Sequence, residues 1–122
     1  MSPDTSWCEK GGTRGYFTVR PMTWDLLWKG SPYKLTAEPG REFESSVPER
    51  LTWLWSPDDP FYLEAALWHD IALESGARVF EADMLWATVA LSRGASIWRT
   101  VAAYTAMLGR RIWQWLSRVA HQ

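Results

Sequence analysis

The sequence predicts an α+β fold, in which a small N-terminal antiparallel β-sheet is followed by three C-terminal α-helices. Two observations support this prediction. Before about residue 57, proline and glycine recur and helical periodicity is weak. After it, apolar residues recur at helical spacing between residues that typically cap helices. The length of 122 residues fits a single domain, β-rich over residues 14–56 and helical over residues 59–120.

Short segments rich in aromatic and β-branched residues predict the β region. Residues 14–20, RGYFTVR, favour a strand. Residues 33–37 and 41–45 flank the sequence EPG, which predicts a hairpin turn with Gly40 at positive φ. Residues 23–30, TWDLLWKG, fit either a strand or one helical turn.

The first two helices are predicted from their capping residues. Asp59 can cap the first helix, Pro60 suits its first position, and Gly76 can end it. The second helix is expected from about Val79 to Ser92, closed by Gly94.

The third helix is predicted to begin after Ser96. Because its apolar register continues across Gly109, we expect one rod of roughly 25 residues, about 37 Å long. We expect an ordinary core helix that buries its apolar stripe and leaves a basic face in solvent. The stripe steps by three and four residues through Ile97, Val101, Tyr104, Leu108, Ile112, Trp115 and Val119.

Composition narrows the class of protein. Apolar residues make up 47% of the chain and charged residues 22%, as in soluble globular proteins. A net charge of −1 argues against nucleic-acid binding. The single cysteine, Cys8, allows no intramolecular disulfide or cysteine-based zinc site, and it lies near a terminus that we expect to be loose. With no secretory signal or transmembrane segment in the sequence, we expect a cytoplasmic or virion-associated protein.

A histidine and an aspartate are predicted to meet across the first two helices. Gly76 lies seven residues from both His69 and Asp83, so a hairpin around it would place the two at the same height. The carboxylate would then fix the tautomer of the imidazole. Asp70 faces about 100° further round the helix. The residue types favour a polar network that fixes helix register, and a reaction centre is the alternative.

Three segments together resemble a known family. FESSVPERLTWLW, LEAALWHDIALESG and EADMLW are similar in order and spacing to the phage and prophage family known as domain of unknown function 1353 (DUF1353), over roughly residues 14–117. The chain departs from the family at Glu44, where Asp is usual, and at Leu73, where many members have Tyr. The resemblance implies an accessory product of tailed phages or prophages with no settled activity, and it leaves the cofactor unknown. The matching positions are Glu44, Ser46, Pro48, Trp53, Trp55, His69, Asp70 and Asp83.

The first functional hypothesis is a phage-derived accessory or virion-associated protein that acts through contacts with other phage or virion proteins. Its ten tryptophans fit interface cores, where aromatic residues concentrate. The His–Asp centre would then be structural.

The second hypothesis is a hydrolase, because the His-Asp pair is similar to the site of secreted phospholipases A2. That resemblance implies His69 as base, Asp70 as calcium ligand and Asp83 as orienting group. The disulfides, the glycine-rich calcium loop and the tyrosine of those enzymes are absent. Because the sequence offers few further oxygen ligands beside Asp70, we expect no metal, and Asp70 would be a ligand only if the protein depended on calcium. A variant would use Ser46 as nucleophile, although SSVP is not a nucleophile elbow.

The third hypothesis is contact with a membrane surface through the last helix. Residues 84–122 contain five arginines and no acidic residue. Together with several tryptophans, this pattern is typical of segments that bind membrane surfaces or acidic partners. The residues predicted to form this interaction surface are Trp98, Arg110, Arg111, Trp113 and Trp115.

Overall fold

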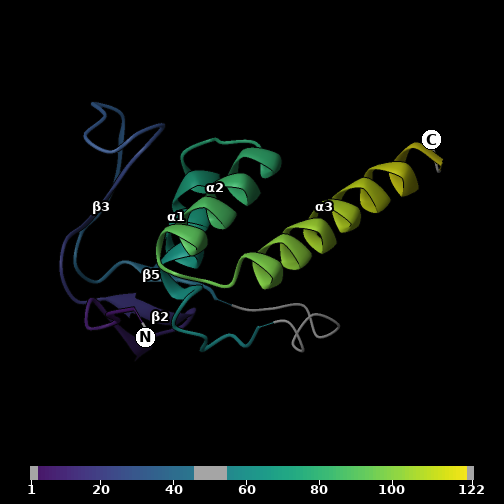
Figure 1. The fold of residues 1–122 in the computed structure, drawn as a ribbon. Coiled ribbons are helices and arrows are strands. Elements are labelled where there is room, and N and C mark those ends of the chain that lie inside the picture. The colour runs from purple at the N-terminus through teal and green to yellow at the C-terminus, as the bar shows by residue number, and fades with distance from the viewer. Residues whose placement is uncertain (1–2, 46–54, 121–122) are drawn as a thin grey trace.

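The computed structural model describes residues 3–45 and 55–120 of the chain. Five short strands precede three helices in this part of the chain, which confirms the predicted α+β fold (Figure 1). The elements are β1 (Cys8–Gly11), β2 (Gly15–Thr18), β3 (Met22–Asp25), β4 (Lys34–Ala37), β5 (Glu42–Phe43), α1 (Leu63–Glu74), α2 (Val79–Ser92) and α3 (Ile97–Ala120).

The described strands form two antiparallel sheets. One has the order β1-β2-β5 and the other pairs β3 with β4. The segment predicted as either strand or helical turn, residues 23–30, therefore begins in the strand β3. The predicted hairpin between residues 33–37 and 41–45 is wrong, because β4 and β5 belong to different sheets.

Thr18 holds the turn between β4 and β5. Its hydroxyl donates to the carbonyl of Glu38 at 2.9 Å and accepts from the amide of Arg41 at 3.0 Å. Gly40 has the predicted positive φ, 87°. The turn is thus braced by β2, and the chain uses it to cross from one sheet to the other.

The N-terminal segment is packed, which corrects the expectation of a loose terminus. Cys8 is buried and pairs with Thr18 in the β1–β2 register. The preceding residue, Trp7, stacks on Phe43 with ring centroids 5.6 Å apart. The packing of Trp7 on Phe43 therefore attaches β1 to the core.

The C-terminal ends of α1 and α2 agree with the prediction from glycine, but the N-terminal start of α1 differs from the predicted one. Gly76 and Gly94, with φ of 96° and 93°, follow α1 and α2 as predicted. However, α1 begins only at Leu63, because Asp59 caps a separate turn by accepting the amide of Phe61 at 3.0 Å.

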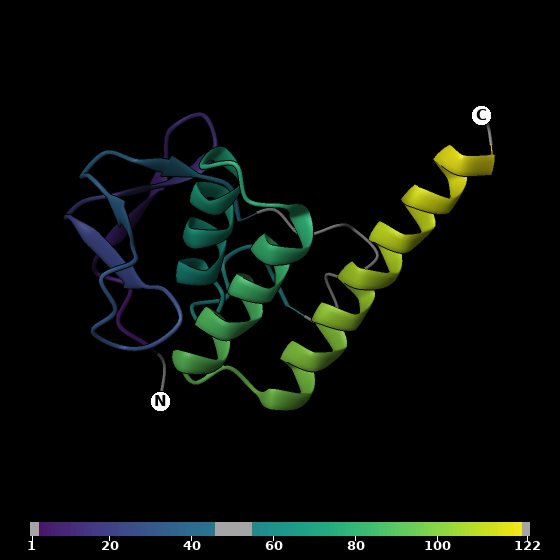
Figure 2. The same ribbon diagram turned by 90° about the horizontal axis from the view of Figure 1, so that it is seen from above.

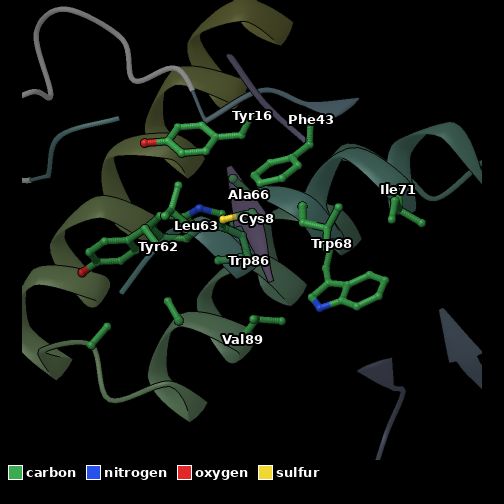
Figure 3. Packing of buried hydrophobic residues seen from close by; sticks show 14 of the residues in the cluster. Cys8, Tyr16, Phe43, Tyr62, Leu63, Ala66, Trp68, Ile71, Trp86 and Val89 are labelled. Atoms are coloured by element: carbon green, nitrogen blue, oxygen red, sulfur yellow. The ribbon is translucent and has the colours of Figure 1, made fainter. Parts of the chain in front are cut away.

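The elements stack in layers, with α1 between the strands and α2, and α3 on the far side of α2 (Figure 2). Figure 3 shows the aromatic side chains at the centre of this stack. Tyr16 and Phe43 stack with centroids 5.8 Å apart, and Tyr62 stacks on Trp86 at 5.1 Å. The core therefore joins the β region to both helices of the α1–α2 hairpin.

The third helix is one continuous rod, as predicted, but it does not bury its apolar stripe. Its fully buried residues are Thr100 and Ala103, small side chains that let α3 approach the body closely. Ile97, Ile112 and Trp115 are 60%, 46% and 57% exposed. The expectation of an ordinary core helix is therefore wrong.

The geometry of α3 explains this exposure. At about 100° per residue, the apolar stripe lies roughly 100° round the helix from the face that packs. The C-terminal half also diverges from the other elements (Figure 2). Within the described residues, no helix combines the length and the apolar character needed to cross a bilayer.

Candidate functional site

His69 and Asp83 meet across the α1–α2 hairpin, as their equal spacing from Gly76 predicts. The His69 Nε2 atom lies 2.8 Å from Asp83 Oδ1. The side chain of Asp83 is 2% exposed and that of His69 is 17% exposed. If Nε2–H donates to the carboxylate, the lone pair of Nδ1 remains available, as in a histidine that acts as a base.

Arg111 of α3 is a third member of this centre. Its Nε forms an ion pair with the second carboxylate oxygen of Asp83, at 3.4 Å. Both oxygens of this buried carboxylate are therefore partnered, and the centre connects α1, α2 and α3. The sequence pattern predicted Arg111 as part of the interaction surface of the last helix, and not as a partner of Asp83. Its spacing of four residues from Met107 and eleven from Thr100, on the packing face of α3, is the signal that could have revealed its role.

Asp70 has different partners from His69. Its Oδ2 accepts the Arg14 guanidinium at 2.9 Å and the backbone amide of Glu44 at 2.8 Å. Burial raises the pKa of the Asp70 carboxyl, an effect opposed by the Glu44 amide and by the charge of Arg14. Arg14 also pairs with Glu74, so these contacts fasten α1 to the β region.

This arrangement does not favour Asp70 as a calcium ligand. The carboxylate oxygen is occupied by two nitrogen donors, whereas calcium takes six to eight oxygen ligands. No group of three His, Cys, Asp or Glu side chains suited to a metal occurs within residues 3–45 and 55–120.

The other residues of the predicted family pattern are not part of the His69–Asp83 centre in the structure. Ser46, Pro48 and Trp53 lie outside the described residues. Trp55 is buried in the core, 5.8 Å from Tyr62 and 5.2 Å from Trp86 between ring centroids. Its role is therefore packing.

A second buried carboxylate, Glu64 of α1, was missed by our sequence analysis. It accepts the Trp68 indole N–H at 3.0 Å and two donors of Arg93 at 2.7 and 2.9 Å. The Glu64 carboxylate raises the pKa of Arg93, whose guanidinium also lies over the Trp24 ring. These contacts satisfy both oxygens, so the cluster is structural. The interval of four between Glu64 and Trp68 was its only sequence signal.

The predicted interaction surface on α3 does not form one face. Trp115 and Arg111 line a groove between α2 and α3, whereas Trp113 lies about 160° round the helix from Trp115. Arg110 and Trp98 are exposed outside the groove. The surface predicted from composition therefore divides into a groove wall and a solvated side.

This α2–α3 groove encloses about 960 Å³. Its walls combine apolar side chains from both helices with two arginines. Arg118 has no acidic partner among the residues that the structure describes. The lining residues are Val79, Phe80, Arg111, Ile112, Gln114, Trp115, Ser117 and Arg118.

Comparisons with protein-family models, curated proteins and solved structures found no significant match. Membership of the DUF1353 family therefore stays a proposal that depends on the order and spacing of the sequence segments.

Proposed function

We propose that the protein is a non-enzymatic adaptor that acts through contacts with another protein, and that α3 carries the contact surface. One observation supports this most directly: α3 is 24 residues long and buries two of them. Five of the seven residues of its apolar stripe are exposed, although burying apolar surface is worth about 25 cal/mol per Å². Contiguous exposed apolar surface of this kind typically marks an interface.

The His69–Asp83–Arg111 centre supports the adaptor by holding α3 in place. Asp83 has a partner on each oxygen, which is what a buried carboxylate needs to be tolerated in a fold. The α2–α3 groove includes Arg111 in its wall but not His69. The hydrolase hypothesis would need a substrate site at His69 and a free Asp70, and Asp70 is engaged by Arg14 and Glu44.

The biological setting that we propose is a phage or prophage. The resemblance to the DUF1353 family supports an accessory or virion-associated role, and it makes other phage or virion proteins the proposed partners. The exposed apolar residues of α3 support this helix as the proposed surface for such a contact.

Site-specific photo-crosslinking in cells that carry the phage or prophage tests this proposal. A photoreactive residue at Ile112, in the groove wall, should join the protein to one defined partner. The same residue at Glu38, exposed in the turn between β4 and β5, should not. Equal adducts at both positions, or none at Ile112, would refute the adaptor role. Mass spectrometry of purified particles would then show whether the partner complex is packaged at a fixed copy number.

A further inference from the structure

We infer that the partner segment is an amphipathic helix carrying acidic residues, which lies in the α2–α3 groove. This deepens the proposed function and rests on it, since it specifies the chemistry of the protein that the adaptor binds.

The apolar walls of the groove favour a helix as the occupant. Val79 and Phe80 from α2 face the same groove as Ile112 and Trp115 from α3, and all four side chains are exposed. An amphipathic helix docks in such grooves through apolar residues spaced at i, i+3, i+4 and i+7. A membrane surface is flat at this scale and would leave the floor of a concave site unfilled.

The charges on the groove specify acidic residues on that helix. Arg118 lines the groove and has no acidic partner among the described residues, while Arg111 is already paired with Asp83. The other arginines of residues 84–122 add little to this attraction, because Arg93, Arg99 and Arg111 are each paired with an acidic side chain and Arg110 lies outside the groove. The attraction of the groove for an anion therefore comes from Arg118. Complementary charge raises association rates and excludes wrong partners.

The same charges argue against a second copy of this chain as the occupant. A twofold interface places the same patch of each copy against the other. Two copies of α3 would bring their unpaired Arg118 side chains together without an acidic residue from either helix. Repulsion between like charges would oppose that dimer.

Binding of two synthetic peptides to the full chain tests the inference. The first is a helix of about 20 residues with leucines at the docking spacing and glutamates beside them, long enough to be helical in water. The second has lysine at every glutamate position. We expect the glutamate peptide to bind at least tenfold more tightly, by fluorescence anisotropy of a label on the peptide.

Two arginine variants locate the contact. Arg118→Glu should weaken binding of the glutamate peptide at least tenfold, whereas Arg110→Glu should weaken it less than about threefold. The two substitutions change the charge equally, on the same helix and at exposed positions, but only Arg118 lines the groove. Phe80→Ala and Trp98→Ala form a second pair. Phe80 lines the groove and Trp98 does not, so Phe80→Ala should weaken binding of the glutamate peptide more than Trp98→Ala. Circular dichroism verifies that each variant is folded.

Four results would overturn the inference. Equal binding of the two peptides, or equal effects of the two arginine variants, would remove the acidic helix as occupant. Binding to phosphatidylserine vesicles, without discrimination between peptides, would favour a membrane surface. A concentration-dependent dimer in sedimentation, abolished by Ile112→Glu, would favour a second copy. If crosslinking at Ile112 still captures one partner, the adaptor role survives and only the acidic helix is lost.

Discussion

The helices α1 and α3 show opposite relations between sequence pattern and burial. Eight of the 12 residues of α1 are buried, although its apolar residues form no single stripe. Two of the 24 residues of α3 are buried, although its stripe is sharply defined. The difference arises from position, since α1 lies between the strands and α2 while α3 meets the body on one side (Figure 2). An amphipathic pattern thus identifies a surface suited to burial, and on α3 the described residues of the chain leave most of that surface exposed.

Tryptophan truncation should give the largest difference between the two helices. Trp68→Ala on α1 should destabilise the fold by about 3 to 5 kcal/mol, because it empties a fully buried site. Trp113→Ala on α3, where the side chain is exposed, should change stability by less than about 0.5 kcal/mol. Urea unfolding measures both. Similar losses in the two variants would mean that α3 is buried in solution.

Replacing a buried-pair arginine should also reduce the free energy of unfolding more than replacing an exposed arginine of α3, but by a smaller margin than the tryptophan variants. Arg93→Met should cost about 2 kcal/mol, because it leaves the buried Glu64 carboxylate with the Trp68 indole as its remaining donor. The Arg93 side chain is 41% exposed, which keeps the cost below that of a fully buried pair. Arg110→Met, with no acidic partner among the described residues, is the control and should be nearly neutral.

The centre that joins the two helices should respond to mutation as a coupled network. His69→Ala and Asp83→Ala should each destabilise the fold by about 1 to 3 kcal/mol. The double variant should cost less than the sum, because each single substitution already removes the His69–Asp83 contact and the double variant loses that contact only once. The four proteins are compared by urea unfolding. Full additivity, or an unchanged stability in His69→Ala, would indicate that the centre has a role other than structure.

Calcium should have the smallest effect, with no change in melting temperature at millimolar concentration. Ligands that bind the native state raise its stability, but Asp70 already accepts two nitrogen donors. Asp70→Asn should therefore melt at the same temperature with and without calcium. A calcium-dependent rise that is lost in Asp70→Asn would restore the phospholipase-like hypothesis.

Local signals in the sequence predicted the helical half of the molecule well. Gly76 and Gly94 end α1 and α2 because glycine adopts positive φ without steric strain. The His69–Asp83 pair was predictable because a tight hairpin places residues equidistant from its turn at the same height. In these cases the structure depends on residues that are close together in the sequence.

Non-local choices could not be predicted from one sequence. The pairing of β5 with β2 depends on Thr18, whose hydroxyl bonds to both sides of a turn, at residues 20 and 23 positions further along the chain. The exposure of the α3 stripe depends on Thr100 and Ala103, small residues whose packing outweighs the hydrophobic pattern around them. Pattern alone does not say which surface a helix turns toward its neighbours.

The α3 rod continues without a break past Gly109, and this has a thermodynamic consequence. Among the described residues, the Arg111–Asp83 pair is the one ion pair that ties α3 beyond Gly109 to the body. About three turns of helix follow Gly109, and an isolated helix of that length is marginal in water. Amide hydrogens there should exchange faster than those around Thr100, and they should become protected when a partner fills the groove. Part of the energy of contact would then be used to order the helix, so the complex would dissociate more readily than its contact area suggests.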